Sequence, residues 1–293
     1  MLRISAQALI VAACLALFSI SPDLLAHWGV PYGTIGGSAP AKVHPGTWLM
    51  TIAVTLAALR FSSPITFAVR AAALFPGLLV FFLTWAFLMW YAIRVQGQPF
   101  TPMIDSFLLP FVTLLALSTQ NDDTKRGVAL ALHALLFVNA LLGLAEYLLG
   151  FRTTPLVAGD IELETEWRST ALIGHPLSNA VIMGSYMIIM SVGGGRDLPK
   201  FLRPVVTLAA LASMVAFGGR TSLVLALLAM AGVFFVRFVG VLRGDTVDVR
   251  MTAAAIALAP LFGVALAALY ASGFFDQMLE RFVNDNGSAR ARW

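Results

Sequence analysis

Residues 166–180 read EWRSTALIGHPLSNA and join an acidic loop to the start of a long apolar run. Proline is favoured at the first position of a helix, because its missing N–H group would have no partner there. The run from Pro176 to Val192 is therefore predicted to be a helix that begins directly after His175. A helix N-terminus carries unpaired N–H groups and a partial positive charge. With Arg168 and His175 close to it, this stretch is a candidate site for an anionic ligand.

The composition excludes an ordinary soluble domain. Hydrophobic residues make up 59% of the 293 residues, charged residues make up only 12%, and the mean hydropathy is +0.86. The apolar runs lack the alternation of apolar and polar residues that membrane β-barrels show. We therefore expect an all-α, polytopic membrane protein. Its basic residues are scattered between the apolar runs, as is typical of charges that flank membrane spans, so no nucleic-acid partner is expected.

Cysteine and histidine do not indicate a metal site. The sequence has one cysteine, Cys14, so no internal disulfide can form. No group of Cys and His residues has metal-ligand spacing, and no glycine-rich nucleotide-binding loop is present. We therefore expect neither a metal nor a cofactor.

Nine apolar runs are predicted to span the membrane within a single integral membrane domain, 1–293. They cover approximately residues 1–20, 45–59, 71–90, 105–117, 127–149, 176–192, 204–217, 223–241 and 251–271. A span needs about 20 residues, so the run 204–217 is expected to be tilted, extended or partly re-entrant. The first run could be a signal peptide with a weak cleavage site at LLA, 24–26. We favour a retained first span, and either interpretation leaves the later topology unchanged.

The distribution of basic residues predicts the orientation of the chain. Short cytoplasmic loops carry an excess of Lys and Arg. With the N-terminus inside, eleven of the nineteen basic residues lie on the cytoplasmic side and eight on the other side. This orientation places the loop 150–175 and the tail 272–293 on the outer side of the membrane. The helices that follow Arg168 and Arg220 then both begin on the outer face.

These two arginines suit a diphosphate ligand. Arg220 lies in the sequence GGRTS, where Thr221 or Ser222 would serve as the helix N-cap. Arginine binds phosphate through two parallel hydrogen bonds, and two helix N-termini add further positive charge. The alternative is purely structural: Arg220 anchors its helix at the level of the lipid headgroups, and Arg168 pairs with the acidic loop.

The order of three motifs resembles a known family. Residues 168–180, RSTALIGHPLSNA, resemble a signature of the bacterial O-antigen ligase and Wzy-type polysaccharide polymerase superfamily: an arginine, a glycine, an Asn-Pro or His-Pro pair and a small residue that opens a helix. GRTS at 219–222 resembles its short arginine motif, and SARARW at 288–293 resembles its Ser-x-Arg-x-x-Trp element. The resemblance covers about residues 125–293. Family members continue into a large periplasmic loop and further spans, so we expect the C-terminal part of the family fold to be missing beyond Trp293.

The resemblance implies a GT-C-like fold and an inverting, metal-independent glycosyltransferase active on the periplasmic face. The donor would be a glycan on undecaprenyl diphosphate, and the acceptor a hydroxyl of another glycan or lipid. The chain would act as a polymerase or ligase in O-antigen or exopolysaccharide biosynthesis, in the lipid bilayer and with other polysaccharide assembly proteins as further partners. The sugar, the acceptor and the choice between ligase and polymerase stay open.

Five residues are candidates for roles in such a reaction. Arg168 and Arg220 would bind the diphosphate, and Arg290 would be a third contact to phosphate or acceptor. His175 is a candidate general base, because the pKa of histidine suits proton transfer near neutral pH. Its alternative role is a hydrogen bond to the loop or to a phosphate. Glu166 is the second candidate base, although acidic loop residues are commonly only solvated.

Two other functions compete with this interpretation. A transporter or flippase of a lipid-linked or anionic substrate would place charged groups near the middle of the membrane, often with internal repeats. Here the informative charges gather at the outer ends and no repeat is visible. A non-catalytic subunit of a polysaccharide assembly complex is the third possibility. Asn139 and Glu146 lie within a predicted span and are functional candidates by position, with Arg152 near enough to pair with Glu146.

Overall fold

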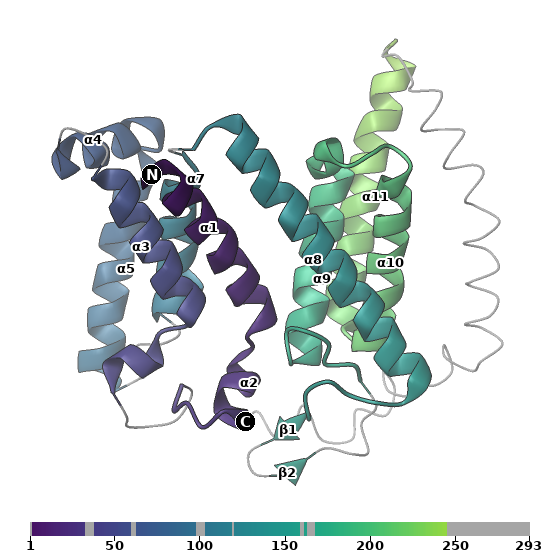
Figure 1. Cartoon of the computed structure of the whole chain (residues 1–293). Coiled ribbons are helices and arrows are strands. Elements are labelled where there is room, and N and C mark those ends of the chain that lie inside the picture. The colour runs from purple at the N-terminus through teal and green to yellow at the C-terminus, as the bar shows by residue number, and fades with distance from the viewer. Residues whose placement is uncertain are drawn as a thin grey trace. The chain divides into compact units, whose positions relative to one another are not determined.

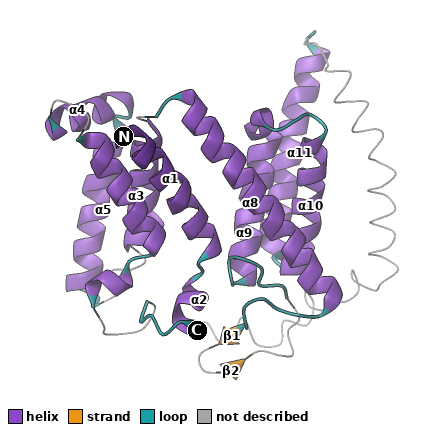
Figure 2. Cartoon of the chain, viewed as in Figure 1, coloured by secondary structure: helices purple, strands orange, loops and turns teal. Residues whose placement is uncertain are grey.

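A computed structural model describes residues 2–32, 38–59, 63–97, 103–118, 120–158, 161–162 and 168–244. This part of the chain is helical, apart from two antiparallel two-residue strands, β1 (Val157–Ala158) and β2 (Ile161–Glu162). Figure 2 shows the helices in purple and the two strands in orange. The predicted all-α class is confirmed. The predicted ninth run, 251–271, and the tail, 272–293, lie outside the described residues.

The longer described helices overlap the first eight predicted apolar runs, while the short elements α2, η1 and η3 lie between them (Figure 1). In chain order they are α1 (Leu2–Ser19), α2 (Pro22–His27), the 3-10 turn η1 (Ala39–Lys42), α3 (Pro45–Ala58), α4 (Pro64–Leu74), α5 (Gly77–Arg94), the π-helical turn η2 (Ile104–Leu108), α7 (Leu109–Ser118), α8 (Asp122–Leu149), α9 (Pro176–Ser191), the 3-10 turn η3 (Gly194–Asp197), α10 (Leu202–Phe217) and α11 (Arg220–Leu242).

The third predicted run, 71–90, does not form one helix. The chain instead forms α4 and α5, which are separated at Phe75 and Pro76. Proline has no N–H group, and its ring clashes with the carbonyl group four residues earlier, so a helix ends before it. The prediction of a single helix here is therefore wrong.

Local signals set the helix ends next to the candidate site. Asn121 caps α8 by accepting a hydrogen bond from the Thr124 N–H group at 3.1 Å, so α8 begins at Asp122, earlier than predicted. It ends at Leu149, and the C-cap Gly150 has a left-handed φ of +71° that lets its N–H group bond back into the last turn. Helix α9 begins at Pro176, as predicted.

Two of the described helices are long and apolar enough to cross a membrane. They are α8 and the segment Thr221–Leu242 of α11. Six further apolar helical segments in the described part have 10–17 residues, whereas a straight span needs about 20. The fold therefore contains two candidate spans by length and composition, and the nine predicted spans are not confirmed.

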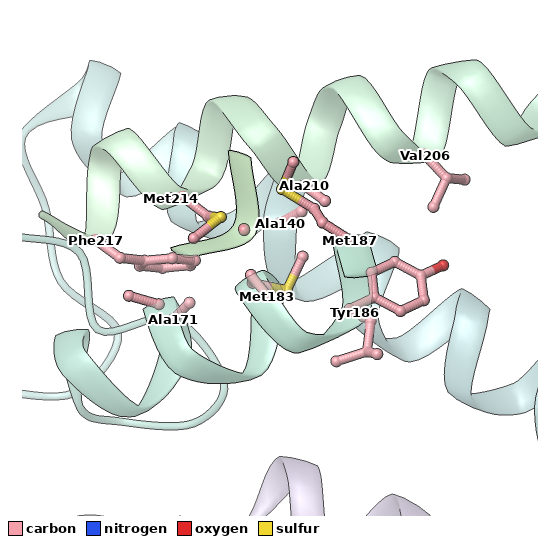
Figure 3. Close-up of a cluster of buried hydrophobic side chains, with 12 residues drawn as sticks. Ala140, Ala171, Met183, Tyr186, Met187, Val206, Ala210, Met214 and Phe217 are labelled. Atoms are coloured by element: carbon pink, nitrogen blue, oxygen red, sulfur yellow. The ribbon is translucent and has the colours of Figure 1, made fainter. Parts of the chain in front are cut away.

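Buried apolar side chains form two clusters in the described chain. One joins α1, α3, α7 and α8 and consists of Ile10, Ala13, Cys14, Met50, Ala53, Val112, Ala116 and Val128. The other joins α8, α9, α10 and α11 and includes Met183, Met187, Met214 and Phe217, as Figure 3 shows. Among the described residues, both clusters lie in one compact unit, which ends at Leu198 and resumes over 206–233, while residues 199–205 and 234–244 belong to a second unit.

Candidate functional site

The motif loop, residues 168–175, leads into α9 and is largely buried. Ser169, Thr170 and Ala171 have no exposed surface. Ala171 has a φ of +43°, in the left-handed region that residues other than glycine rarely adopt. Gly174 has a φ of +75°, which glycine adopts without strain. The surroundings of the motif loop must therefore stabilise its conformation.

Glu146 of α8 binds the backbone of the motif loop. Its fully buried carboxylate accepts hydrogen bonds at Oε2 from the N–H groups of Thr170 at 2.7 Å and Ala171 at 2.9 Å. Its Oε1 accepts one from the Thr153 N–H group at 2.8 Å. Such bonds offset the loss of hydration that burial imposes on a carboxylate. The sequence suggests Arg152 as the partner of Glu146, but backbone N–H groups hold both of its oxygens.

Asn139 of α8 and Asn179 of α9 form a second buried link. Asn139 Nδ2 donates to Asn179 Oδ1 at 2.8 Å, and Asn139 Oδ1 accepts from the Leu172 N–H group at 3.1 Å. Asn179 Nδ2 donates to the carbonyl oxygens of Thr170 at 2.6 Å and His175 at 3.1 Å. Both amides are almost fully buried, and a buried polar group without a partner would be destabilising. This pair connects α8, the motif loop and the first turn of α9.

Two hydroxyl groups add further contacts to the motif loop. The Ser169 hydroxyl donates to the Gly143 carbonyl oxygen at 2.7 Å, and the Ser169 N–H group donates to the Ala216 carbonyl oxygen at 3.1 Å. The Thr170 hydroxyl donates to the Thr154 carbonyl oxygen at 2.8 Å. Helix α8, helix α10 and the segment that follows α8 thus all bind the loop.

Arg168 lies against the turn between α10 and α11. A Cβ atom at Gly218 would lie 3.3 Å from Arg168 Cδ and 3.4 Å from Arg168 Nε. Gly218 stands two residues before Arg220 and has a φ of +67°. Arg152 Nε donates to the Arg168 carbonyl oxygen at 3.2 Å. Arg168 is therefore placed beside the start of the helix that carries Arg220, whose own side chain is not among those described.

The N-terminal turns of α9 and α11 are in contact. A Cβ atom at Gly219 would lie only 2.0 Å from the Cβ atom of Ala180. The Leu223 N–H group donates to the Gly219 carbonyl oxygen at 3.0 Å, so Gly219 is the N-cap of α11. The predicted N-cap, Thr221 or Ser222, is therefore wrong. The helix begins earlier, at a glycine that has no side chain to separate it from α9.

His175 is the N-cap residue of α9. Its backbone is extended, with φ −132° and ψ 126°, and its carbonyl oxygen accepts the Asn179 N–H group at 3.0 Å. Its imidazole is partly exposed and makes no capping hydrogen bond. The two other predicted site residues, Glu166 and Arg290, lie outside the described residues.

The network around Glu146 is only partly visible in the sequence. Asn139, Gly143 and Glu146 are spaced by four and three residues, which places them on one face of a helix. That spacing, and the two polar groups within a span, could have indicated a helix face directed at a buried polar segment. Asn179 lies within the motif 168–180, but the motif pattern indicates no role for it.

A second polar cluster surrounds Asp105 of η2. Asp105 Oδ2 accepts from the Tyr32 hydroxyl at 2.5 Å and from the His44 N–H group at 3.0 Å. Asp105 Oδ1 accepts from the Thr47 hydroxyl at 2.6 Å. Burial and the hydrogen bond to Asp105 raise the pKa of Tyr32 above its ordinary value. The cluster ties the segment before α3 and the first turn of α3 to η2.

Within the described ranges, no group of three or more His, Cys, Asp or Glu side chains could hold a metal ion. Comparison with protein-family models, with curated proteins and with solved structures gives no match for this chain. The functional assignment therefore depends on the chemistry of the motif loop and of the two helix N-termini beside it.

Proposed function

We propose that this chain is a multi-pass protein of the bacterial inner membrane that acts in polysaccharide biosynthesis. It would transfer a glycan from undecaprenyl diphosphate to an acceptor hydroxyl on the periplasmic face, by an inverting reaction without a metal. One observation carries the proposal: Arg168 of the motif loop packs against Gly218, two residues before Arg220. The backbone that carries Arg220 therefore lies beside Arg168, although the two arginines belong to separate sequence motifs.

Exposed apolar side chains support a location in the membrane. Leu79 and Phe87 on α5, Val138 on α8 and Leu228 on α11 are 59%, 60%, 52% and 64% exposed. Apolar surface spread over several helices is unfavourable in water, whereas lipid chains would cover it in a bilayer. The long helices α8 and α11, together with the shorter apolar helices, would then form the multi-pass domain that the hydropathy pattern predicts.

The surroundings of Arg168 suit a diphosphate. The N-terminal turns of α9 and α11 are in contact at Ala180 and Gly219, and each helix N-terminus carries a partial positive charge. Oxygen atoms of a diphosphate can accept hydrogen bonds from a guanidinium group and from backbone N–H groups at the same time. In the proposal, Arg168 and Arg220 bind the diphosphate, and Arg290 is a third contact.

The proposed chemistry exchanges one bond at the anomeric carbon of the donor sugar for another. The acceptor oxygen attacks this carbon, the bond to the diphosphate oxygen breaks, and the acceptor proton passes to a general base. Fixed cations stabilise the negative charge that develops on the departing diphosphate. His175 is the proposed base, because its imidazole is partly exposed and does not cap α9. Glu166 is the second candidate.

A transfer assay with purified protein in lipid tests the proposal. The substrate is a glycan on undecaprenyl diphosphate, and the product is a new glycosidic bond. Arg168→Ala and Arg220→Ala should abolish transfer while the protein stays in the membrane. Arg94→Ala is the control, since Arg94 is an exposed arginine in the last turn of α5. Full activity in both site variants would refute the proposal, and substrate movement without new glycosidic bonds would instead indicate a flippase.

A further inference from the structure

Four consecutive backbone N–H groups of the motif loop are bound by acceptors from neighbouring helices. Ser169 donates to the Ala216 carbonyl oxygen of α10, as described above. Thr170 and Ala171 donate to Glu146, and Leu172 donates to Asn139. A loop usually satisfies such groups with water or with its own turns. Here both acceptors on α8 are side chains.

These contacts fix both ends of the motif loop. The Thr170 and His175 carbonyl oxygens share one donor, Asn179 Nδ2, so their separation is set by a single amide group. At the other end, the Ser169 N–H and hydroxyl groups are bound next to Arg168. Two of the residues proposed to act on the substrate, Arg168 and His175, therefore flank a segment whose backbone is held at every residue from 169 to 172.

From this arrangement we infer that Glu146 and the Asn139–Asn179 pair are positioning residues, which hold the motif loop so that Arg168 and His175 meet the same lipid diphosphate donor. The inference rests on the proposed function for the identity of that donor. Burial of an ionisable group within a membrane helix costs free energy, and such groups commonly serve a function. Apolar residues of similar volume commonly stabilise a buried site as well as charged ones do, so packing alone does not account for Glu146.

The strain in the loop supports the same inference. Ala171 keeps a left-handed φ although it is not glycine, and its N–H group is one of the two bound by Glu146 Oε2. Residues in such conformations persist only where the surrounding structure over-determines them, which is common at ligand-binding sites. Glu146 therefore enforces a backbone conformation that the loop would not adopt by itself.

The substitution Glu146→Gln tests the positioning role of Glu146 with almost no change in the shape of the side chain. Both carboxylate oxygens of Glu146 accept N–H groups, so either orientation of the glutamine amide turns an NH2 group towards at least one backbone donor. Asp123→Asn is the matched control, because it makes the same chemical change at an exposed position in the first turn of α8.

Hydrogen exchange measured by mass spectrometry gives a readout that does not depend on catalysis. For Glu146→Gln we expect exchange within residues 168–175 to speed up about tenfold or more, with α1 and α3 unchanged. We also expect kcat for glycan transfer to fall by about tenfold to a hundredfold, with a smaller change in the donor KM, because Arg220 lies outside the motif loop. Asp123→Asn should match the wild type in both measurements.

The outcomes separate the two proposals. Exchange in 168–175 that stays at the wild-type rate, or faster exchange spread over all helices, would overturn the positioning role. Absence of glycan transfer by the wild type would refute the proposed function while the exchange data still test the network. If Glu146→Gln does not accumulate, Asn139→Leu removes the acceptor of the Leu172 N–H group without adding a polar group, and the same local increase in exchange is expected.

Discussion

Gly143 of α8 lies directly against the ring of Phe217 at the end of α10: a Cβ atom at Gly143 would be 2.5 Å from Cε1 and Cζ of that ring. Phe217 is fully buried, and the Gly143 carbonyl oxygen accepts the hydrogen bond of the Ser169 hydroxyl. The same glycine thus sets how closely α10 approaches α8 and binds the motif loop. Gly218 follows directly after α10 and packs against Arg168, so the contact between Gly143 and Phe217 also helps to position Arg168.

Gly143→Ala should destabilise the protein by about 1–3 kcal/mol, because the added methyl group would displace the Phe217 ring from a packed site. Thermal unfolding in detergent measures the change. Gly127→Ala, on the same helix, has nothing within 4 Å of the new atom and should be neutral or slightly stabilising. Equal unfolding temperatures for the two variants would show that α8 and α10 are not packed as described.

Gly219→Ala should reduce glycan transfer strongly, because its Cβ atom would overlap that of Ala180 and separate α9 from the start of α11. The rate of transfer, normalised to the amount of protein in the membrane, is the measurement. Gly232→Ala is the control on α11, since nothing lies within 4 Å of its added atom. An unchanged rate in Gly219→Ala would argue against a site that depends on both N-termini.

Ala171→Gly should change the free energy of unfolding by less than about 1 kcal/mol. Relief of left-handed strain, about 1–2 kcal/mol, is largely offset by the greater freedom of glycine in the unfolded chain. Ala171→Val should instead destabilise by about 2 kcal/mol or more, because a β-branched side chain fits neither the φ of +43° nor the fully buried site. Denaturant titration compares the two, and equal stability would contradict the left-handed assignment.

The contact between Tyr32 and Asp105 predicts a loss of stability at alkaline pH. The pKa of Tyr32 is raised on folding, so the folded state favours the neutral phenol. Its stabilising contribution is complete below the ordinary tyrosine pKa of about 10 and is lost as the pH rises above that value. Unfolding temperatures between about pH 8 and about pH 11 should fall less steeply in Tyr32→Phe than in the wild type. Parallel curves would contradict the prediction.

Local sequence signals predicted where helices end, but they did not predict which segments contact one another. Pro176 marks the start of α9 because proline acts on its own turn. Pro76 ends α4 through the same local chemistry of proline. The continuous apolar run around Pro76 nevertheless led to the prediction of a single helix. Helix α11 begins at Arg220, earlier than predicted, and its N-cap Gly219 lies against Ala180 of another helix. No rule based on neighbouring residues in the sequence indicates how close Gly219 and Ala180 lie.

The candidate site shows the same limit of local reasoning. The sequence indicated Arg168 and His175 through a motif, and it marked Glu146 and Asn139 as functional candidates only by their position within a predicted span. Their partners within residues 169–172 are backbone N–H groups of Thr170, Ala171 and Leu172, which lie 24, 25 and 33 residues away in the chain. Backbone N–H groups are present at almost every position, so the sequence alone does not show which of them a buried side chain will bind.

A double-mutant cycle on lipid diphosphate binding tests the central claim most directly. The affinity of undecaprenyl diphosphate is measured for the wild type, Arg168→Ala, Arg220→Ala and the double variant. If both guanidinium groups bind one diphosphate, each single variant should bind about tenfold or more weakly, and the double variant should differ from the product of the two single effects. Wild-type affinity in either single variant, or strictly independent effects, would contradict a shared diphosphate site.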